Sequence, residues 1–188
     1  MNKKSLLRKV LEFTHRPLII LHKSHGLERV PKGPFILVAN HPHWFDGPVL
    51  YTTFFYRLGH DVKFLAAQST YSNKMFRFYY KVFEIVMVEE KSGKSAFNEA
   101  LSLLKSGSSV GIFPEGESTI IKPKNAKTGA VRLSLLTGAP IVPVKIVKKK
   151  RWHLFVGKPY FPKKISISDW AAVRKESSML LDHVYSIA

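Results

Sequence analysis

Short runs of consecutive apolar residues recur along the chain, separated by longer stretches with helical spacing. Runs of this kind, typical of strands buried on both faces, cover residues 35–39, 62–66, 85–88, 110–113 and 141–146, and a further strand is predicted at 152–156. Helical stretches lie at about residues 47–58, 71–82, 93–105 and 128–137, and a last helix extends from Ser168-Asp169 to about Tyr185. This alternation predicts an α/β fold, a single domain in which a mostly parallel central sheet is flanked by helices.

The N-terminal segment has a different pattern. Residues 3–24 show helical spacing with a break before Pro17, because apolar and basic side chains occupy different positions of the repeat. We therefore predict an amphipathic helical segment over residues 1–29, ahead of the main domain over residues 30–188. Two alternatives fit its basic, apolar character: the segment lies among lipid headgroups, or it caps the domain core with a solvated basic face.

The net charge is the most unusual bulk property of the chain. Lys and Arg number 30 against 13 Asp and Glu, which gives +17 and favours a polyanionic partner: nucleic acid, an anionic membrane surface, or an acidic carrier or nucleotide. The absence of cysteine excludes disulfides, thiol nucleophiles and cysteine-based zinc sites. No apolar run approaches the roughly 20 residues of a membrane span, and no secretory signal is recognised. If the protein meets a membrane, we expect it to lie on the surface.

Polar, titratable side chains follow two of the predicted strands. Asn40 and His41 come directly after the run at residues 35–39, and Glu115 and Gly116 come shortly after the run at 110–113. In sheets of this class, functional groups gather beyond the carboxyl ends of the strands. The two loops therefore predict one site at one edge of the sheet.

His41 and Asp46 are the candidate catalytic pair. An imidazole titrates near neutral pH and suits a general base, and a carboxylate can fix its tautomer and stabilise the imidazolium form. Asp46, five residues later at the start of a predicted helix, could fold back to supply that carboxylate. Taken alone, the same spacing also fits a loop histidine followed by a helix N-cap.

Three sequence blocks in a fixed order carry a resemblance to a known family. Asn40, His41 and Asp46 match an N-H-x4-D block, residues 113–116 match F-P-E-G, and residues 142–144 match V-P-V. Over roughly residues 30–160 the chain resembles the lysophosphatidate acyltransferase family of glycerolipid acyltransferases. The proline within the third block, Pro143, is unusual in a central strand and predicts an edge position or irregular pairing.

The resemblance implies transfer of a fatty acyl group from a thioester, either acyl-CoA or an acyl carrier protein, to a hydroxyl of a lysophospholipid-like acceptor. His41 would be the base and Asp46 its partner, with no cofactor or metal. Substrate binding would involve Asn40, Glu115, Gly116, Lys127 and the region around Pro143. The implied enzyme is an O-acyltransferase that lies peripherally on the cytoplasmic face of the membrane, with its acyltransferase domain over residues 30–188.

The chain departs from the family pattern where the acceptor phosphate is bound. The family block continues T-R-S after F-P-E-G, whereas Gly116 is followed here by Glu117, Ser118 and Thr119, so the arginine is missing. A second block ends in Glu89-Glu90 where an arginine is expected. Lys127 is the first candidate for the replacement cation, because Lys127-Thr128-Gly129 matches a family K-x-G stretch; the others are Lys91, Lys94, Lys122 and Lys124. A different acceptor headgroup, such as an amine bound by Glu117 or Glu90, is the alternative.

Two other function classes remain open from the residues alone. His41, His43 and Asp46 could form a metal-dependent hydrolase site, although their order departs from the usual dinuclear pattern. The chain could also be a non-enzymatic basic protein that binds a membrane or nucleic acid. It carries no known nucleic-acid-binding motif, and we do not expect nucleic acid to be a partner. The basic run at residues 148–151 fits either a solvated hairpin turn or a contact with anionic headgroups.

Overall fold

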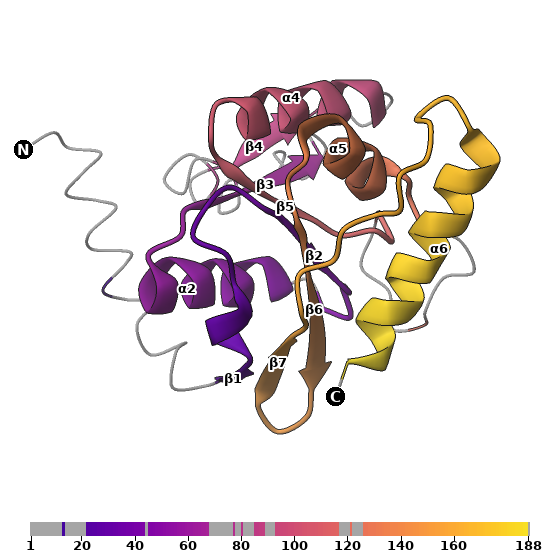
Figure 1. Cartoon of the computed structure of the whole chain (residues 1–188). Coiled ribbons are helices and arrows are strands. Elements are labelled where there is room, and N and C mark those ends of the chain that lie inside the picture. Colours follow the sequence, from indigo (N-terminus) through magenta and orange to yellow (C-terminus); the bar gives the residue numbers. More distant parts are fainter. Residues whose placement is uncertain are drawn as a thin grey trace, which may run out of the picture.

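A seven-stranded sheet forms the centre of the computed structural model, which describes residues 22–43, 45–67, 85–88, 93–116 and 126–187 together with residues 13, 77, 80 and 121. The strand order is β1-β7-β6-β2-β5-β3-β4 (Figure 1). The strands are β1 (His22–His25), β2 (Ile36–Ala39), β3 (Val62–Ala67), β4 (Val86–Val88), β5 (Ser109–Ile112), β6 (Ile141–Lys148) and β7 (Trp152–Val156). Neighbouring strands run parallel, except that β6 and β7 form an antiparallel hairpin.

Helices cover both faces of the sheet (Figure 1). One face packs against α2 (Asp46–Leu58), and the other packs against α4 (Gly93–Lys105), α5 (Gly129–Thr137) and α6 (Trp170–Ser186). Successive residues of β2 alternate between the two cores: Leu37 joins the α2 side and Val38 the other side. Both side chains have no exposed surface, which explains why this strand reads as a continuous apolar run.

The predicted α/β sheet with flanking helices is confirmed. Each predicted strand is present within one to two residues of its expected bounds, and α2, α4, α5 and α6 coincide with four of the predicted helices. Nearly all of the predicted helix at residues 71–82, and residues 3–21 of the helix predicted at 3–24, lie outside the described residues, apart from residues 13, 77 and 80, which are helical. Within the described part of the chain, no helix combines the length and the apolarity that crossing a bilayer requires.

The expected helix is wrong for residues 22–24, which belong to strand β1. This strand extends the sheet at its edge by pairing in parallel with β7, from His22 opposite Trp152 to His25 opposite Phe155. His22 is buried, and its Nε2 lies 2.7 Å from the hydroxyl oxygen of Thr53 in α2. A polar strand of this kind shows no apolar run, so its partner β7 and not local spacing determines its conformation.

The unusual proline of β6 lies in an interior strand, between β2 and β7, so the expected edge position is wrong. The expected irregular pairing is confirmed. The regular β6–β7 register ends with Val144 opposite Val156, and the carbonyl of Pro143 then accepts the Gly157 N–H at 2.8 Å. Ile141 forms an isolated bridge with Tyr160. Pro143 is therefore buried in the sheet where β7 has already diverged, and its missing N–H interrupts no regular ladder.

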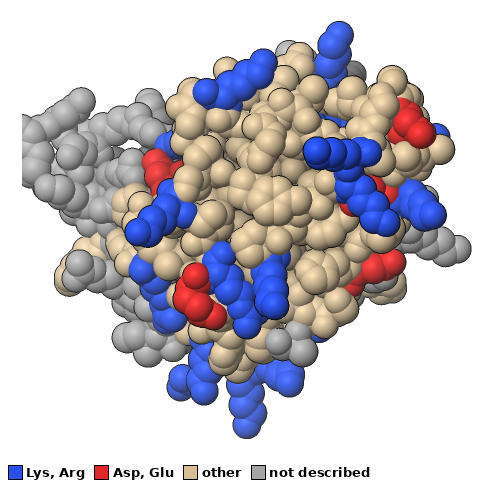
Figure 2. All heavy atoms as spheres, in the orientation of Figure 1, with Lys and Arg blue, Asp and Glu red and all other residues tan. Residues whose placement is uncertain are grey.

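The basic run at residues 148–151 forms the turn of the β6–β7 hairpin, as one of its two interpretations predicts. All four side chains of the run are exposed. Lys and Arg also outnumber Asp and Glu on the face of the molecule in Figure 2.

Candidate active site

His41 and Asp46 face each other at the carboxyl end of β2. The Nδ1 atom of His41 lies 3.2 Å from Oδ2 of Asp46, and the aspartate side chain has no exposed surface. Asp46 is the first residue of α2, but the N-cap position is Phe45 and carries no side-chain cap. The predicted pairing is therefore confirmed as a contact, and the alternative of a simple N-cap does not describe this aspartate.

The carboxylate of Asp46 accepts two further hydrogen bonds. Its Oδ2 accepts the backbone N–H of His43 at 2.7 Å, and its Oδ1 accepts the indole N–H of Trp152 at 3.1 Å. Both donors and the N-terminal end of α2 face this buried carboxylate. When Asp46 accepts a hydrogen bond from the imidazole, the ring proton is on Nδ1, and Nε2 is then the nitrogen that would take a proton from a substrate.

An aromatic stack sets the plane of the His41 ring. Phe113 lies against the imidazole with a centroid separation of 4.0 Å and an interplanar angle of 14°, and Phe64 lies 6.2 Å further along. Gly111 makes room for this stack, because a Cβ at that position would lie 2.3 Å from the Phe64 ring. The phenylalanine of the F-P-E-G block thus orients the candidate base.

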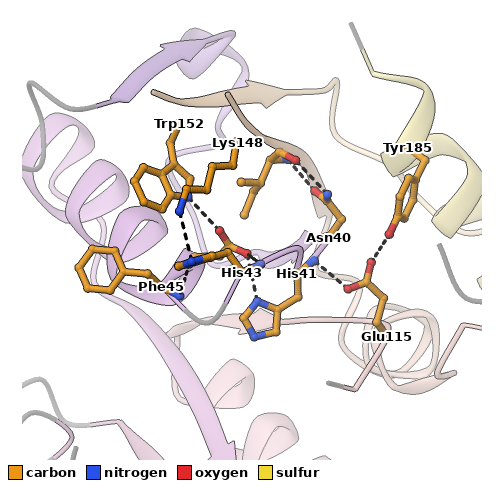
Figure 3. Close-up of polar contacts among 10 residues, drawn as sticks. Asn40, His41, His43, Phe45, Glu115, Lys148, Trp152 and Tyr185 are labelled. Carbon is orange, nitrogen blue, oxygen red and sulfur yellow. Dashed lines mark hydrogen bonds and ion pairs between the residues drawn. The ribbon is translucent and has the colours of Figure 1, made fainter. Parts of the chain in front are cut away.

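Glu115, in the loop after β5, contacts both α6 and the loop of residues 40–45, which we call the catalytic loop. Its Oε2 accepts the backbone N–H of His41 at 2.7 Å, and its Oε1 accepts the hydroxyl of Tyr185, from α6, at 2.5 Å (Figure 3). Burial raises the pKa of Glu115 above its usual value, and the hydrogen bonds from Tyr185 and His41 oppose this rise. Burial, followed by the bond to Glu115, raises the pKa of Tyr185. These contacts hold His41 from its backbone side, and the predicted role of Glu115 in binding the acceptor stays a prediction.

Asn40 anchors the loop to β6. Its side-chain N–H donates to the carbonyl of Ile146 at 3.0 Å, and its side-chain oxygen accepts the N–H of Ile146 at 2.6 Å. Asn40 is buried, so this pair of bonds continues the β2–β6 pairing one step beyond the last residue of β2. A role for Asn40 in binding substrate stays a prediction.

The second histidine of the loop faces N–H donors. Nδ1 of His43 accepts the backbone N–H of Phe45 at 3.2 Å, and Nε2 lies 3.2 Å from the ammonium nitrogen of Lys148. Lys148 in turn sits 4.3 Å from the centroid of the Trp152 ring. His43 therefore does not converge with His41 and Asp46 on a common point, and no metal-binding group of three His, Asp or Glu occurs among the residues that the structure describes.

Lys127 lies beside the F-P-E-G turn. Its backbone N–H donates to the carbonyl of Pro114 at 2.8 Å, and its side chain passes over Gly116. Gly116 has a φ of 85°, and a Cβ there would also lie 3.1 Å from Cε of Lys127, so two constraints favour glycine. The predicted neighbourhood is thus present, whereas binding of the acceptor by Gly116 or Lys127 stays a prediction. Other residues that the sequence relates to acceptor binding lie outside the described residues: Glu89, Glu90, Lys91, Glu117, Ser118, Lys122 and Lys124.

Two residues of the site, Trp152 and Tyr185, did not emerge from the sequence. The indole N–H of Trp152 donates to Asp46, which lies 106 residues away in the sequence, and the hydroxyl of Tyr185 donates to Glu115, which lies 70 residues away. A partly buried indole or phenol usually finds a hydrogen-bond partner, which was the one available signal. Neither belongs to a recognisable block, and only the fold identifies the acceptor.

Comparison of the sequence with known proteins finds acyltransferases. The profile of the acyltransferase family matches residues 22–147. The 1-acyl-sn-glycerol-3-phosphate acyltransferase of Bacillus subtilis (strain 168) is 28% identical over 148 residues, which cover 73% of this chain and 72% of that protein. A chloroplastic 1-acyl-sn-glycerol-3-phosphate acyltransferase of Brassica napus is 27% identical over 128 residues, covering 65% of this chain and 36% of that protein.

A solved structure shares the fold. The crystal structure of the 1-acyl-sn-glycerophosphate (LPA) acyltransferase PlsC from Thermotoga maritima superposes with a TM-score of 0.65 at 19% identity. The match covers all of this chain and 85% of that one.

Proposed function

The chain belongs to the acyltransferase family, and we propose that it transfers a fatty acyl group from a thioester donor to the free hydroxyl of a lysophosphatidate-like acceptor. The observation that carries this proposal is the contact of His41 with the buried, three-fold hydrogen-bonded carboxylate of Asp46. The names of the two sequence relatives support the acceptor class, since both are 1-acyl-sn-glycerol-3-phosphate acyltransferases.

The proposed reaction uses His41 as a general base and then as a general acid. Nε2 takes the proton of the acceptor hydroxyl while the hydroxyl oxygen attacks the thioester carbonyl carbon. The tetrahedral intermediate collapses by breaking its carbon–sulfur bond, and the imidazolium returns the proton to the leaving thiolate. The products are an ester and a free thiol. Asp46 stabilises the imidazolium between the two proton transfers, and general-base catalysis of this kind contributes about 10² to 10⁴ in rate.

The positive charge of the protein supports its proposed partners. Acyl-CoA, an acyl carrier protein and an anionic membrane leaflet are all polyanionic, and a net charge of +17 attracts each of them. We place the enzyme on the cytoplasmic face of the membrane as a peripheral protein. The phosphate of the acceptor would be met by Lys127, whose side chain crosses the F-P-E-G turn that follows β5.

A thiol-release assay tests the proposal directly. Purified protein is supplied with acyl-CoA or with acylated acyl carrier protein, each combined with lysophosphatidate or lysophosphatidylethanolamine, and thiol release and diacyl product are measured together. We expect turnover with lysophosphatidate and a loss of about 10² to 10⁴ in His41→Ala. Absence of turnover with every lysolipid, or full turnover in His41→Ala, would refute the enzyme function, and a preference for the amine-bearing acceptor would refute the acceptor class.

A matched pair of lysine variants tests the phosphate contact. Lys127→Ala should raise KM for lysophosphatidate, whereas Lys105→Ala, an exposed lysine at the end of α4, should leave KM unchanged. An equal rise in KM for both substitutions would mean that the overall positive charge of the protein, and not a contact with Lys127, attracts the phosphate.

A further inference from the structure

The β6–β7 hairpin projects beyond the edge of the sheet that carries the active site. β6 pairs with β2 only as far as Val144, whereas its pairing with β7 continues to Lys148. The turn therefore extends past the loop that holds His41. In Figure 1 the hairpin is the lowest part of the sheet, and in Figure 2 Lys and Arg side chains project from the same end of the molecule.

The tip of this hairpin is made of four consecutive cations, residues 148–151, which we call the basic tip. All four side chains are exposed. Within the described part of the chain, Lys149, Lys150 and Arg151 form no ion pair with a carboxylate. Adjacent like charges without a compensating carboxylate repel one another, and an external anionic surface would relieve that repulsion.

The basic tip is also connected to the catalytic loop. Its first residue, Lys148, contacts His43 and lies over the ring of Trp152, and Trp152 donates to Asp46. A surface that binds the tip therefore comes to lie within two side-chain contacts of the catalytic carboxylate. A lipid acceptor held in such a surface would have a short path to His41.

We propose that the basic tip is the element that docks the enzyme on the anionic face of a lipid bilayer and presents the active-site edge to it. The proposal rests on the proposed function, because a lipid acceptor is what makes a bilayer the fitting occupant. Each basic residue near an anionic leaflet contributes about 1 kcal/mol, which corresponds to a factor of about five in affinity. The attraction weakens with salt because exposed charges are screened over about 8 to 10 Å at physiological ionic strength.

A matched pair of charge-reversal variants tests the docking surface. The first carries Lys149→Glu, Lys150→Glu and Arg151→Glu, and keeps Lys148 so that its contacts near the site remain. The second carries Lys164→Glu, Arg174→Glu and Lys175→Glu, which are exposed residues before and within the first half of α6 and give the same change of net charge. Thermal unfolding of both variants verifies that each is folded.

The first readout is co-sedimentation with vesicles of phosphatidylglycerol and phosphatidylcholine, compared with phosphatidylcholine alone. The tip variant should bind the anionic vesicles between about 10- and 100-fold more weakly than the wild type, while the α6 variant should stay within about threefold. Wild-type binding should also fall with added salt. Because this measurement needs no acceptor, its outcome is independent of whether the proposed acyl transfer is correct.

The second readout is turnover on two forms of the acceptor. With a short-chain acceptor dissolved as monomers the tip variant should keep wild-type turnover, and with acceptor embedded in anionic vesicles it should lose at least tenfold. Equal weakening in both variants, unchanged vesicle binding by the tip variant, or an equal loss on both acceptor forms would overturn the proposal. A loss confined to reactions with an acyl carrier protein as donor would also overturn it, and would assign the tip to that acidic protein.

Discussion

Two buried carboxylates flank the catalytic loop, and their surroundings are closely similar. Asp46 has no exposed side-chain surface and Glu115 is 7% exposed. Each accepts a backbone N–H of the loop, from His43 and His41 respectively, and each accepts an aromatic donor from a distant element. Among the contacts seen in the described part of the chain, the imidazole of His41 distinguishes them, because its Nδ1 faces Asp46.

This difference separates a carboxylate that takes part in the chemistry from one that positions the base. During proton transfer a positive charge develops on the imidazole, and the carboxylate of Asp46 would stabilise it. Asp46 therefore lowers the free energy of the transition state. Glu115 holds the backbone of the same histidine, and its contacts are the same before and after the proton moves. The comparison predicts that equivalent amide substitutions at the two positions have very different consequences.

Asp46→Asn should have the largest effect, a fall in kcat of about 10² to 10⁴ with little change in KM. Three N–H donors converge on this carboxylate, from Trp152, His43 and the His41 ring. An amide presents only one oxygen, so one of its sides must turn an NH₂ group toward a buried donor. Steady-state kinetics measures the change, with thermal unfolding as the control for folding. Retention of kcat within threefold would contradict the role of Asp46.

Glu115→Gln should reduce kcat by at most about tenfold, the equivalent of roughly 1.4 kcal/mol. Here one oxygen accepts the His41 N–H, and the other meets a hydroxyl of Tyr185 that can rotate and accept from the new NH₂ group. The amide therefore fits where the carboxylate was. A rise in KM for the acceptor without a change in kcat would instead support direct contact of Glu115 with substrate.

The same variant should change the dependence of stability on pH. Because burial raises the pKa of Glu115 above 4.5, the folded protein holds this proton more tightly than the unfolded chain. Wild-type stability therefore falls, relative to the Gln variant, as pH rises from 4.5 through the raised pKa, and the difference is constant above it. Urea unfolding of both proteins between about pH 4 and 8 measures this difference. A difference that changes in the opposite direction would mean that the pKa is lowered.

The two carboxylates were predictable from the sequence, whereas their aromatic donors were not. Apolar runs in the sequence predict both β2 and β5. Because the two strands are parallel neighbours, the residues that follow their carboxyl ends, His41 and Glu115, lie close together. Trp152 lies 106 residues from Asp46, and Tyr185 lies 70 residues from Glu115. No local pattern encodes such a pairing, because it depends on where β7 and α6 pack. The polar strand β1 was missed for the same reason.

Trp152→Phe should lower kcat by about fivefold, because Asp46 keeps two of its three donors. The substitution removes the indole N–H that meets Oδ1 and retains an aromatic ring near Lys148 and His43. The expected loss corresponds to about 1 kcal/mol, within the usual range for one hydrogen bond. Trp170→Phe is the matched control, since Trp170 is 48% exposed at the start of α6 and stacks on Arg132. Equal losses of kcat in the two variants would mean that the hydrogen bond from Trp152 to Asp46 does not contribute to catalysis.

The smallest effect is expected at the other aromatic donor. Tyr185→Phe removes one of the two hydrogen bonds to Glu115 and should lower the free energy of unfolding by about 1 to 2 kcal/mol near neutral pH. That bond lowers the pKa of Glu115, so its loss raises the pKa further. The destabilisation should consequently diminish as the pH falls below the raised pKa of Glu115, where the carboxyl becomes protonated with or without the tyrosine. We expect kcat to fall by only about twofold, since the His41 N–H still reaches Glu115.

The chain contains a second tyrosine–glutamate pair that makes this prediction specific. The hydroxyl of Tyr160 donates to buried Glu176 at 2.5 Å, the same distance as from Tyr185 to Glu115, but Glu176 receives its other bond from the N–H of Lys163 and not from the catalytic loop. Tyr160→Phe should therefore cost similar stability and leave kcat unchanged. If both variants lowered kcat equally, the loss would reflect general loosening of the fold. If neither did, the bond from Glu115 to His41 would position the base without help from α6.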